Sequence, residues 1–306
     1  MELWPGYDWT KLTRRAWAAS RCIDYLVGRP DVDARRIALT GHSRNGKTSL
    51  IAAALDERIA AVISSSSGAG GACTYRLFSE VQFGEGIELI TRQFPDWLHP
   101  RLRFFVGREE RLPVDQHELI ACIAPRPCLI STALNDAVES VWAVERTAEA
   151  ARPVYALWGA TNNLALRYRD GGHPTRAEDI ESYLDWLDDQ WDHPVPSGRA
   201  SPGRKPERRR EKMPAATRFR ASSPIYPTYE DWLRLSRERI DPLRFPPHDV
   251  DESIPATNGE PGMTLADWEA KRTEIRRRVE WGLGTPPPAA VSVAGDYGAE
   301  SRPTAV

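Results

Sequence analysis

The sequence predicts an α/β fold in which helices pack on a short parallel sheet, followed by a mostly irregular and helical C-terminal extension. Before residue 194, short apolar runs alternate with segments of helical apolar spacing, which is typical of strand–helix units on a parallel sheet. A glycine-containing turn from Gly41 to Gly46 joins one such strand to the next helix. Beyond residue 194 the alternation stops, and the composition turns to Pro, Arg, Lys, Ser and Gly.

The expected elements follow one another in a regular order. Apolar runs predict four strands, at residues 36–40, 60–64, 127–133 and 164–169. Helical spacing predicts helices at residues 10–27, 45–56, 144–151 and 177–190. Four parallel strands joined in this way fit the second half of a doubly wound sheet.

The chain divides into three regions by composition. Residues 1–194 form the α/β region, and residues 195–222 form a basic linker that we expect to be disordered. Within the extension, residues 223–306, the spacing predicts helices at 229–240 and 264–282, followed by a disordered tail. With 306 residues, length alone leaves open one domain with an appendage or two small domains.

The composition excludes several classes of partner. The chain has 41 Lys and Arg against 43 Asp and Glu, so no net field favours nucleic acid or an anionic membrane. The four cysteines lack the spacing of a metal knuckle or redox pair, and no metal or organic cofactor is expected. No apolar run approaches membrane-spanning length and no export signal is found, so the sequence predicts a soluble protein. The oligomeric state is left open.

The run Gly41-His42-Ser43-Arg44-Asn45-Gly46 has the strand–turn–helix context of a nucleophile elbow. Such a turn needs small residues because strand and helix approach closely, and it exposes the serine hydroxyl at the helix N-terminus. The second glycine follows Ser43 by three residues instead of two, so the literal Gly-x-Ser-x-Gly motif is not matched. The departure indicates either a broken elbow or a particular subgroup.

The run TGHSRNGK resembles the signature of the glucuronoyl esterases, an α/β-hydrolase family with Ser-Arg-x-Gly-Lys at its elbow. Other pieces agree in order and spacing, namely ASRCIDYL, DVDARRIALTGHSR, LDERIAAVISSSSGAGGA, FPDWL, LPVDQHELIACIAPRP and DGGH. The resemblance covers roughly residues 5–190. It implies a partial α/β-hydrolase three-layer sandwich and a carboxylester hydrolase acting on a carbohydrate ester.

Carried over position by position, the resemblance implies roles for four residues. Ser43 is the nucleophile, and Arg44 helps to bind the oxyanion through its backbone N–H and its side chain. Lys47 binds hydroxyl groups of a uronic acid sugar, and Glu85 matches a glutamate that contacts the sugar. The alternative for Arg44 and Lys47 is that they are solvated charges on an exposed helix turn.

The general base is expected to be a histidine after the last strand, in the chain order Ser, acid, His. His173 fits, because it follows the strand at 164–169 and the turn Asp170-Gly171-Gly172. Many glucuronoyl esterases carry the acid as a Glu before the Ser-Gly-Ala-Gly-Gly run, but Ser66 stands there. We therefore expect Asp136, after the next strand, to be the acid, with Glu139 as the alternative.

Two departures from the family pattern bear on function. Val138 stands where the family has a Trp, which puts glucuronate specificity in doubt. A complete hydrolase domain also has strands ahead of the nucleophile strand, so we expect the N-terminal half of the domain to be lacking. Residues 267–286 resemble the helix that precedes the first strand in such esterases.

Three classes of function follow as expectations: an active esterase, an inactive hydrolase remnant and an interaction protein. The first is a serine esterase that cleaves esters of glucuronate or 4-O-methylglucuronate in plant cell-wall xylan through Ser43, His173 and Asp136. The alternatives are an acetyl xylan or generic esterase, a truncated and inactive hydrolase remnant, or an interaction protein tethered by residues 195–306. The family resemblance implies export, whereas the chain as written implies a cytoplasmic location.

Overall fold

The sheet at the centre of the fold consists of four parallel strands in sequence order. They are β1 (Ala38–His42), β2 (Ala61–Ser65), β3 (Cys128–Ala133) and β4 (Leu164–Arg169). The structure is a computed structural model, and it describes residues 9–77, 85–191, 233, 237–250, 254 and 263–284. Every residue of β2 and β3 is buried, as expected for the middle strands of a sheet covered on both faces.

The strand register brings the four carboxyl ends together at one edge. His42 pairs with Ser65, Ser65 with Ser131, and Ala133 with Arg169. Residues that leave the sheet after these positions therefore lie side by side, and in open α/β sheets this edge is where ligands bind.

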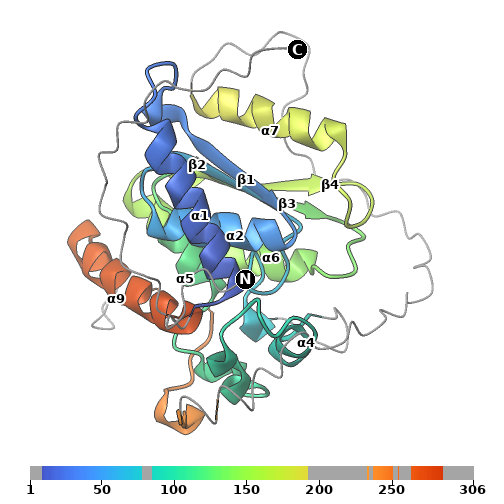
Figure 1. Cartoon of the computed structure of the whole chain (residues 1–306), viewed down its shortest axis with the longest axis vertical. Helices are drawn as coiled ribbons and strands as arrows, with labels where there is room; N and C mark the ends of the chain where they lie inside the picture. The colour runs from blue at the N-terminus through green and yellow to red at the C-terminus, as the bar shows by residue number, and fades with distance from the viewer. Residues whose placement is uncertain are drawn as a thin grey trace, which may run out of the picture.

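Helices cover both faces of the sheet, as the three-layer prediction requires. One face carries α1 (Lys11–Leu26), α2 (Arg44–Leu55), α5 (Gln116–Ala121) and α6 (Val141–Leu157), and the other carries α7 (Ala177–Gln190) (Figure 1). The α7 side has its own small core, in which Tyr183, Trp186 and Leu187 pack on Ala61, Ile63 and Leu129. Apolar side chains spaced along one side of α7 produce this contact.

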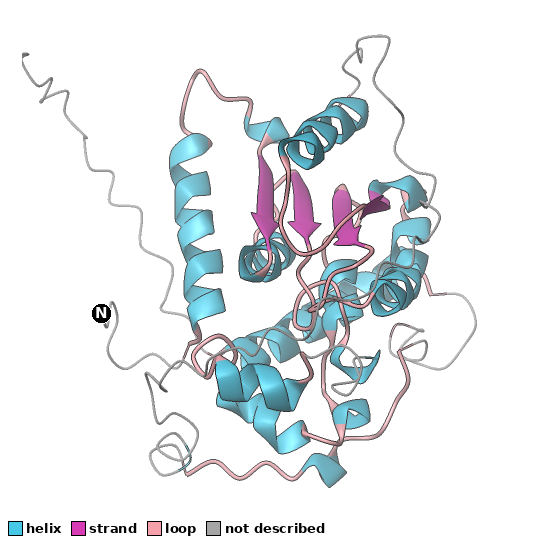
Figure 2. Ribbon diagram, turned by 90° about the vertical axis from the view of Figure 1, so that its right-hand side faces the viewer, coloured by secondary structure: helices cyan, strands magenta, loops and turns pink. Residues whose placement is uncertain are grey.

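The segment between β2 and β3 contains most of the irregular structure. It includes η2 (Tyr75–Leu77), α4 (Ile87–Gln93), η3 (Pro100–Phe105) and η4 (Glu109–Arg111). Figure 2 shows short helices beyond the arrowheads of the strands, so this part of the chain lies on the carboxyl side of the sheet.

The helix α9 (Leu265–Leu283) packs against the same core as the sheet. Its capping box joins Thr264 to Asp267, and Trp268, the most deeply buried of its side chains, is 0% exposed. At its other end the carbonyl oxygen of Leu283 accepts a hydrogen bond from the N–H of Thr10 at 3.3 Å. The last helix described therefore ends beside the first.

The fold class predicted from the sequence is confirmed, and the four strands lie within two residues of their predicted positions. The helix predicted at 144–151 is longer, because Ser140 caps its start and α6 continues through Pro153 to Leu157. The helix predicted at 264–282 is confirmed as α9. The linker at 195–222 and the tail lie outside the described residues, as does most of 229–240, of which residue 233 is helical and residues 237–240 are not.

All four cysteines are free. Within the described ranges, no helix is long and apolar enough to cross a membrane.

Candidate active site

Ser43 lies at a sharp turn between β1 and α2. Its backbone has φ 57° and ψ −127°, a conformation that is strained for a residue with a side chain. A Cβ atom on Gly41 would lie 2.1 Å from the carbonyl oxygen of Asn45, so only glycine fits there. A Cβ atom on Gly46 would lie 2.9 Å from Cβ of Ser67. The second glycine is therefore needed at position 46, where α2 passes close to the exit of β2.

The side chains of Ser43, His173 and Asp136 form a continuous hydrogen-bonded chain. Oγ of Ser43 lies 3.0 Å from Nε2 of His173, and Nδ1 of His173 lies 2.9 Å from Oδ2 of Asp136. The Asp136 side chain is 0% exposed, whereas that of His173 is 37% exposed. The three groups have the geometry of a nucleophile, a base and the carboxylate that orients the base.

The environment tunes the pKa values of this pair in opposite directions. Burial favours the neutral carboxyl of Asp136, but hydrogen bonds from His173 and from the N–H of Val138 at 3.0 Å outweigh it and lower its pKa. The hydrogen bond to Asp136 raises the pKa of His173 above its ordinary value of 6.5, although partial burial opposes the shift. Asp136 is therefore a stable anion that favours the imidazolium.

Glu139, the alternative acid, contacts a different part of the site. Its Oε2 accepts a hydrogen bond from the N–H of Gly68 at 2.8 Å, and burial raises its pKa to about 7. The structure thus brings Asp136 to His173, while Glu139 binds the glycine-rich loop that follows β2. Pairing continues beyond the strands, from the N–H of Asn135 to the carbonyl of Gly171 at 3.0 Å, and this holds the loops of Asp136 and His173 in register.

Arg44 occupies the first position of α2, where backbone N–H groups have no partner within the helix. Its exposed guanidinium stacks over the ring of Trp97 at 5.4 Å, and Trp97 in turn stacks on Phe94 with ring centroids 3.9 Å apart. Trp97 is 7% exposed, so it both packs in the core and supports Arg44. The positively polarised helix end and the guanidinium can bind an anion beside Ser43.

Lys47 is buried and points toward the glycine-rich loop after β2. Its Nζ donates to the carbonyl oxygens of Ser67 at 2.5 Å and Ala69 at 2.7 Å, and to Oε2 of Glu85 at 3.3 Å. An ammonium group has three donors, so these contacts use all of them. The structure brings Lys47 and Glu85 together, and Lys47 binds both the glycine-rich loop and the glutamate.

Three residues around Ser43, His173 and Asp136 were not singled out by the sequence analysis, namely His42, Thr175 and Arg169. The ring of His42 lies 4.7 Å from that of His173, and its Nδ1 lies 2.8 Å from Oγ1 of Thr175. Arg169 ends β4 and donates to the Ser66 hydroxyl beneath the loop of His173. Burial lowers the pKa of His42, and the neighbouring charges of His173 and Arg169 lower it further. The sequence could have indicated Arg169, because it is a cation at the end of a predicted strand, just before the turn that carries His173.

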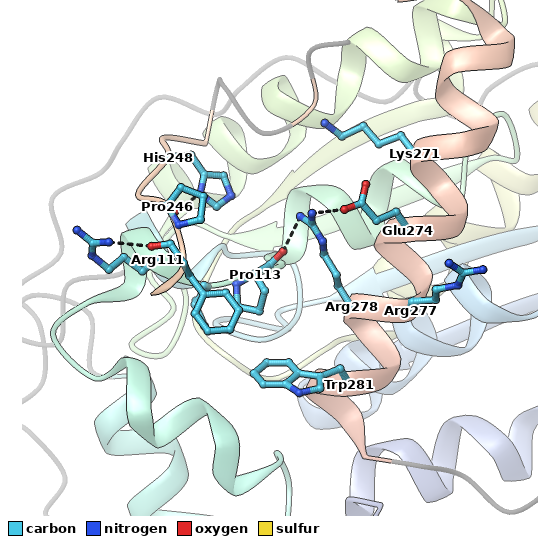
Figure 3. Close-up of a pocket in the computed structure, with 11 residues that line it drawn as sticks. Arg111, Pro113, Pro246, His248, Lys271, Glu274, Arg277, Arg278 and Trp281 are labelled. Atoms are coloured by element: carbon cyan, nitrogen blue, oxygen red, sulfur yellow. Dashed lines mark hydrogen bonds and ion pairs between the residues drawn. The ribbon is translucent and has the colours of Figure 1, made fainter. Parts of the chain in front are cut away.

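A cavity lies away from these residues, between α9 and the segment 245–248 (Figure 3). It has a volume of about 660 Å³, and its lining includes Arg111, Phe245, Arg278 and Trp281 but no predicted site residue. Arg278 pairs with Glu274 and donates to the carbonyl of Pro113 at 3.1 Å. Arg111 likewise donates to the carbonyl of Phe245 at 2.7 Å, so these two cations serve internal contacts. Among the residues that the structure describes, no cluster of three or more His, Cys, Asp or Glu side chains could hold a metal ion.

Comparison with known proteins gives consistent matches. A sequence model described as "Glucuronyl esterase, fungi" matches residues 2–159, just over half of the chain. Carbohydrate esterase MZ0003, from an unknown prokaryotic organism, is 36% identical over 200 residues, which cover 59% of this chain and 44% of that protein. The chain spans less than half the length of the first curated relatives it matches.

Two solved structures resemble the fold. A carbohydrate esterase family 15 glucuronoyl esterase from Caldicellulosiruptor kristjansonii matches with a TM-score of 0.57 and 32% identity, covering 65% of this chain and 56% of that one. A mutant glucuronoyl esterase from Sporotrichum thermophile, in complex with methyl 4-O-methyl-beta-D-glucopyranuronate, matches with a TM-score of 0.52 and 26% identity, covering 62% and 54%.

Proposed function

Because the chain belongs to the glucuronoyl esterase family of α/β hydrolases, we propose that it is a serine carboxylester hydrolase that cleaves esters of glucuronate or 4-O-methylglucuronate in plant cell-wall xylan. The observation that carries the proposal is the hydrogen-bonded chain from Ser43 through His173 to the buried Asp136. Family members bind glucuronate esters, as the Sporotrichum thermophile complex illustrates.

The proposed reaction proceeds in two steps. Nε2 of His173 takes the proton of Ser43 as Oγ attacks the ester carbonyl, and the same proton passes to the alcohol oxygen as the alcohol leaves. Water then attacks the acyl–Ser43 carbonyl after losing a proton to His173, and the acid product leaves as Ser43 is reprotonated. The buried carboxylate of Asp136 holds the imidazole in the required tautomer and stabilises its charged form.

The oxyanion of each tetrahedral intermediate is stabilised at the start of α2. The backbone N–H of Arg44 and its guanidinium supply positive charge where the negative charge develops. A single oxyanion donor contributes about 3 kcal/mol to such a transition state. Stacking on Trp97 holds the guanidinium in place without neutralising it.

The pair of Lys47 and Glu85 is proposed to face the sugar. The Glu85 carboxylate, whose side chain is 16% exposed, accepts from hydroxyl groups, and Lys47 fixes its orientation. Lys47 itself has its three donors engaged by the protein, and Val138 stands where the family has Trp. These two features favour a second candidate, an acetyl xylan or generic esterase with the same chemistry.

The test is hydrolysis of 4-nitrophenyl acetate and of benzyl glucuronate by the purified chain, beside Ser43→Ala. Turnover of the glucuronate ester by the wild type alone supports the proposed substrate. Turnover of the acetate alone supports the generic esterase. If a folded wild type cleaves neither, the chain is an inactive hydrolase remnant and the proposal is wrong.

A further inference from the structure

Arg169 is a buried cation at the carboxyl end of β4. Its side chain is 4% exposed, and it lies directly below the turn that carries His173. A guanidinium is always charged, so its burial is unfavourable unless polar groups surround it. The groups that surround Arg169 belong to the candidate active site.

Its donors converge on the main chain around His173. Nη1 donates to the carbonyl oxygen of Pro174 at 2.8 Å and lies 3.5 Å from that of Gly172. Nη2 donates to the carbonyl oxygen of His173 itself at 3.2 Å. Three successive carbonyls therefore face one cation, which fixes the turn on both sides of the histidine.

The far side of the guanidinium is held by two other elements. Nη2 donates to the hydroxyl of Ser66 at the exit of β2, and Nη1 lies 3.6 Å from the Asp179 carboxylate in the first turn of α7. The Ser66 hydroxyl is also close enough to the Asp136 carboxyl to lower its pKa. Arg169 thus links the turn of His173 to the strand exits on its other side.

We propose that Arg169 is a positioning residue for His173, which fixes the 172–174 turn so that the imidazole reaches both Ser43 and Asp136. The proposal rests on the proposed esterase function. A small shift of this turn moves Nε2 out of line with Oγ of Ser43, and misplacement by about 1 Å lowers a catalysed rate by about 100-fold.

A cation that contacts the main chain of His173 should also oppose protonation of its imidazole. The ionisable groups near His173 include Asp136, His42, Glu85 and Glu139, and Arg169 lies against its carbonyl oxygen. The three carboxyl groups favour the imidazolium, and the cation opposes it. Loss of the cation therefore raises the pKa of His173 and moves the acid limb of the rate profile to higher pH.

The experiment compares Arg169→Met and Arg169→Lys with the wild type, measuring kcat/KM against pH and the melting temperature. The matched control is Arg152→Met. Arg152 donates to the carbonyls of Thr161 and Leu164 at 3.2 Å, at the opposite end of β4. We expect Arg169→Met to lower kcat/KM by about 10- to 100-fold and to move the acid limb upward. Arg169→Lys keeps the charge, so it should move the limb less and recover part of the rate, while the control stays within about twofold.

The proposal is overturned if Arg169→Met is folded and active within about twofold, or if both Arg169 variants leave the acid limb unmoved and lose no more activity than Arg152→Met. If Arg169→Met does not fold, Arg169→Lys decides, and the proposal is overturned if that variant is active within about twofold with an unmoved acid limb. Labelling of Ser43 by a fluorophosphonate separates this outcome from failure of the enzyme function. An unlabelled, inactive wild type refutes the esterase proposal, whereas a labelled, active wild type with unaffected Arg169 variants refutes only the positioning role.

Discussion

The Asp136 carboxylate meets Nδ1 of His173 at 2.9 Å, although the two residues belong to loops that leave different strands. Glu139, three residues beyond Asp136, instead binds the N–H of Gly68 at 2.8 Å. One acidic side chain is thus held against the histidine and the other against the glycine-rich loop. The two carboxyls can be separated experimentally.

Asp136→Asn should lower kcat by about 10³- to 10⁴-fold, because an amide favours the wrong imidazole tautomer and cannot stabilise its charge. Glu139→Gln keeps an acceptor for Gly68 and should lower kcat by less than about tenfold. Both variants are measured on the ester that the wild type cleaves best. The reverse order of effects would make Glu139 the acid.

The pH profile of kcat/KM should have its acid limb centred above 6.5, because the hydrogen bond to Asp136 raises the pKa of His173. His173 acts as a base only when neutral, so activity rises as pH passes through this pKa. In Asp136→Asn the midpoint should move downward as the stabilising charge is lost. An acid limb that does not move between the two proteins would show that another group controls it.

Lys47→Met should destabilise the fold by about 3 to 5 kcal/mol, because it leaves the Glu85 carboxylate and two loop carbonyls without their buried donor. Urea unfolding at neutral pH measures the change. Lys11 pairs with Asp96 near the surface, so Lys11→Met is the control and should change stability by less than about 1 kcal/mol. Equal effects of the two substitutions would contradict the stabilising role that we assign to the buried contacts of Lys47.

Glu118 should make stability fall as pH rises from about 4.5 to about 7. Burial raises its pKa from 4.5 to about 7, so in this window the folded state holds a proton that the unfolded state has lost. The glutamine of Glu118→Gln cannot ionise, and it retains an acceptor for the N–H of Asp115. The free energy of unfolding of this variant should exceed that of the wild type by up to about 3 kcal/mol at pH 8, and by little at pH 4.5. Melting temperatures across this range test the difference, with the exposed Glu149→Gln as control. If the melting temperatures of Glu118→Gln and the wild type change in parallel with pH, the prediction for Glu118 is wrong.

Trp268→Ala should destabilise the whole domain by about 3 to 5 kcal/mol, because this fully buried side chain joins α9 to the main core. Trp142 is 53% exposed, and Trp142→Ala should cost about 0.5 kcal/mol or less. A single cooperative transition that shifts only in Trp268→Ala supports α9 as part of the same folding unit. A separate early transition that leaves the main one unchanged would show that α9 unfolds on its own.

Much of the sheet could be predicted because its strands are short apolar runs separated by amphipathic helices. Periodicity located β2 and β3 well, since buried strands are apolar at successive positions. The short helices α4 and α5 were not predicted, because six or seven residues are too few for a helical period to stand out. Their positions depend on tertiary contacts and caps, such as the capping box between Asp115 and Glu118.

The sequence could nominate site residues by type and order, but it could not place their side chains. Asp136 and Glu139 lie on one short loop with the same chemistry, and only the fold separates the contacts they make. The positions of His42 and Arg169 depend on strand register, which brings β1 and β4 residues to His173 from both sides. The burial of Lys47 was also unforeseen, because the glycine-rich loop that covers it follows a different strand.

Each group of the candidate site leaves the sheet from its own strand: Ser43 after β1, Ser66 after β2, Asp136 after β3 and His173 after β4. Neighbouring strands are about 4.8 Å apart, so adjacent exits can present a carboxylate to nearly the same place. A substitution in the loop after one strand therefore leaves the register of the other strands unchanged. The acid of such a site can therefore lie on the loop after β2 or on the loop after β3, while the nucleophile and the base keep their positions.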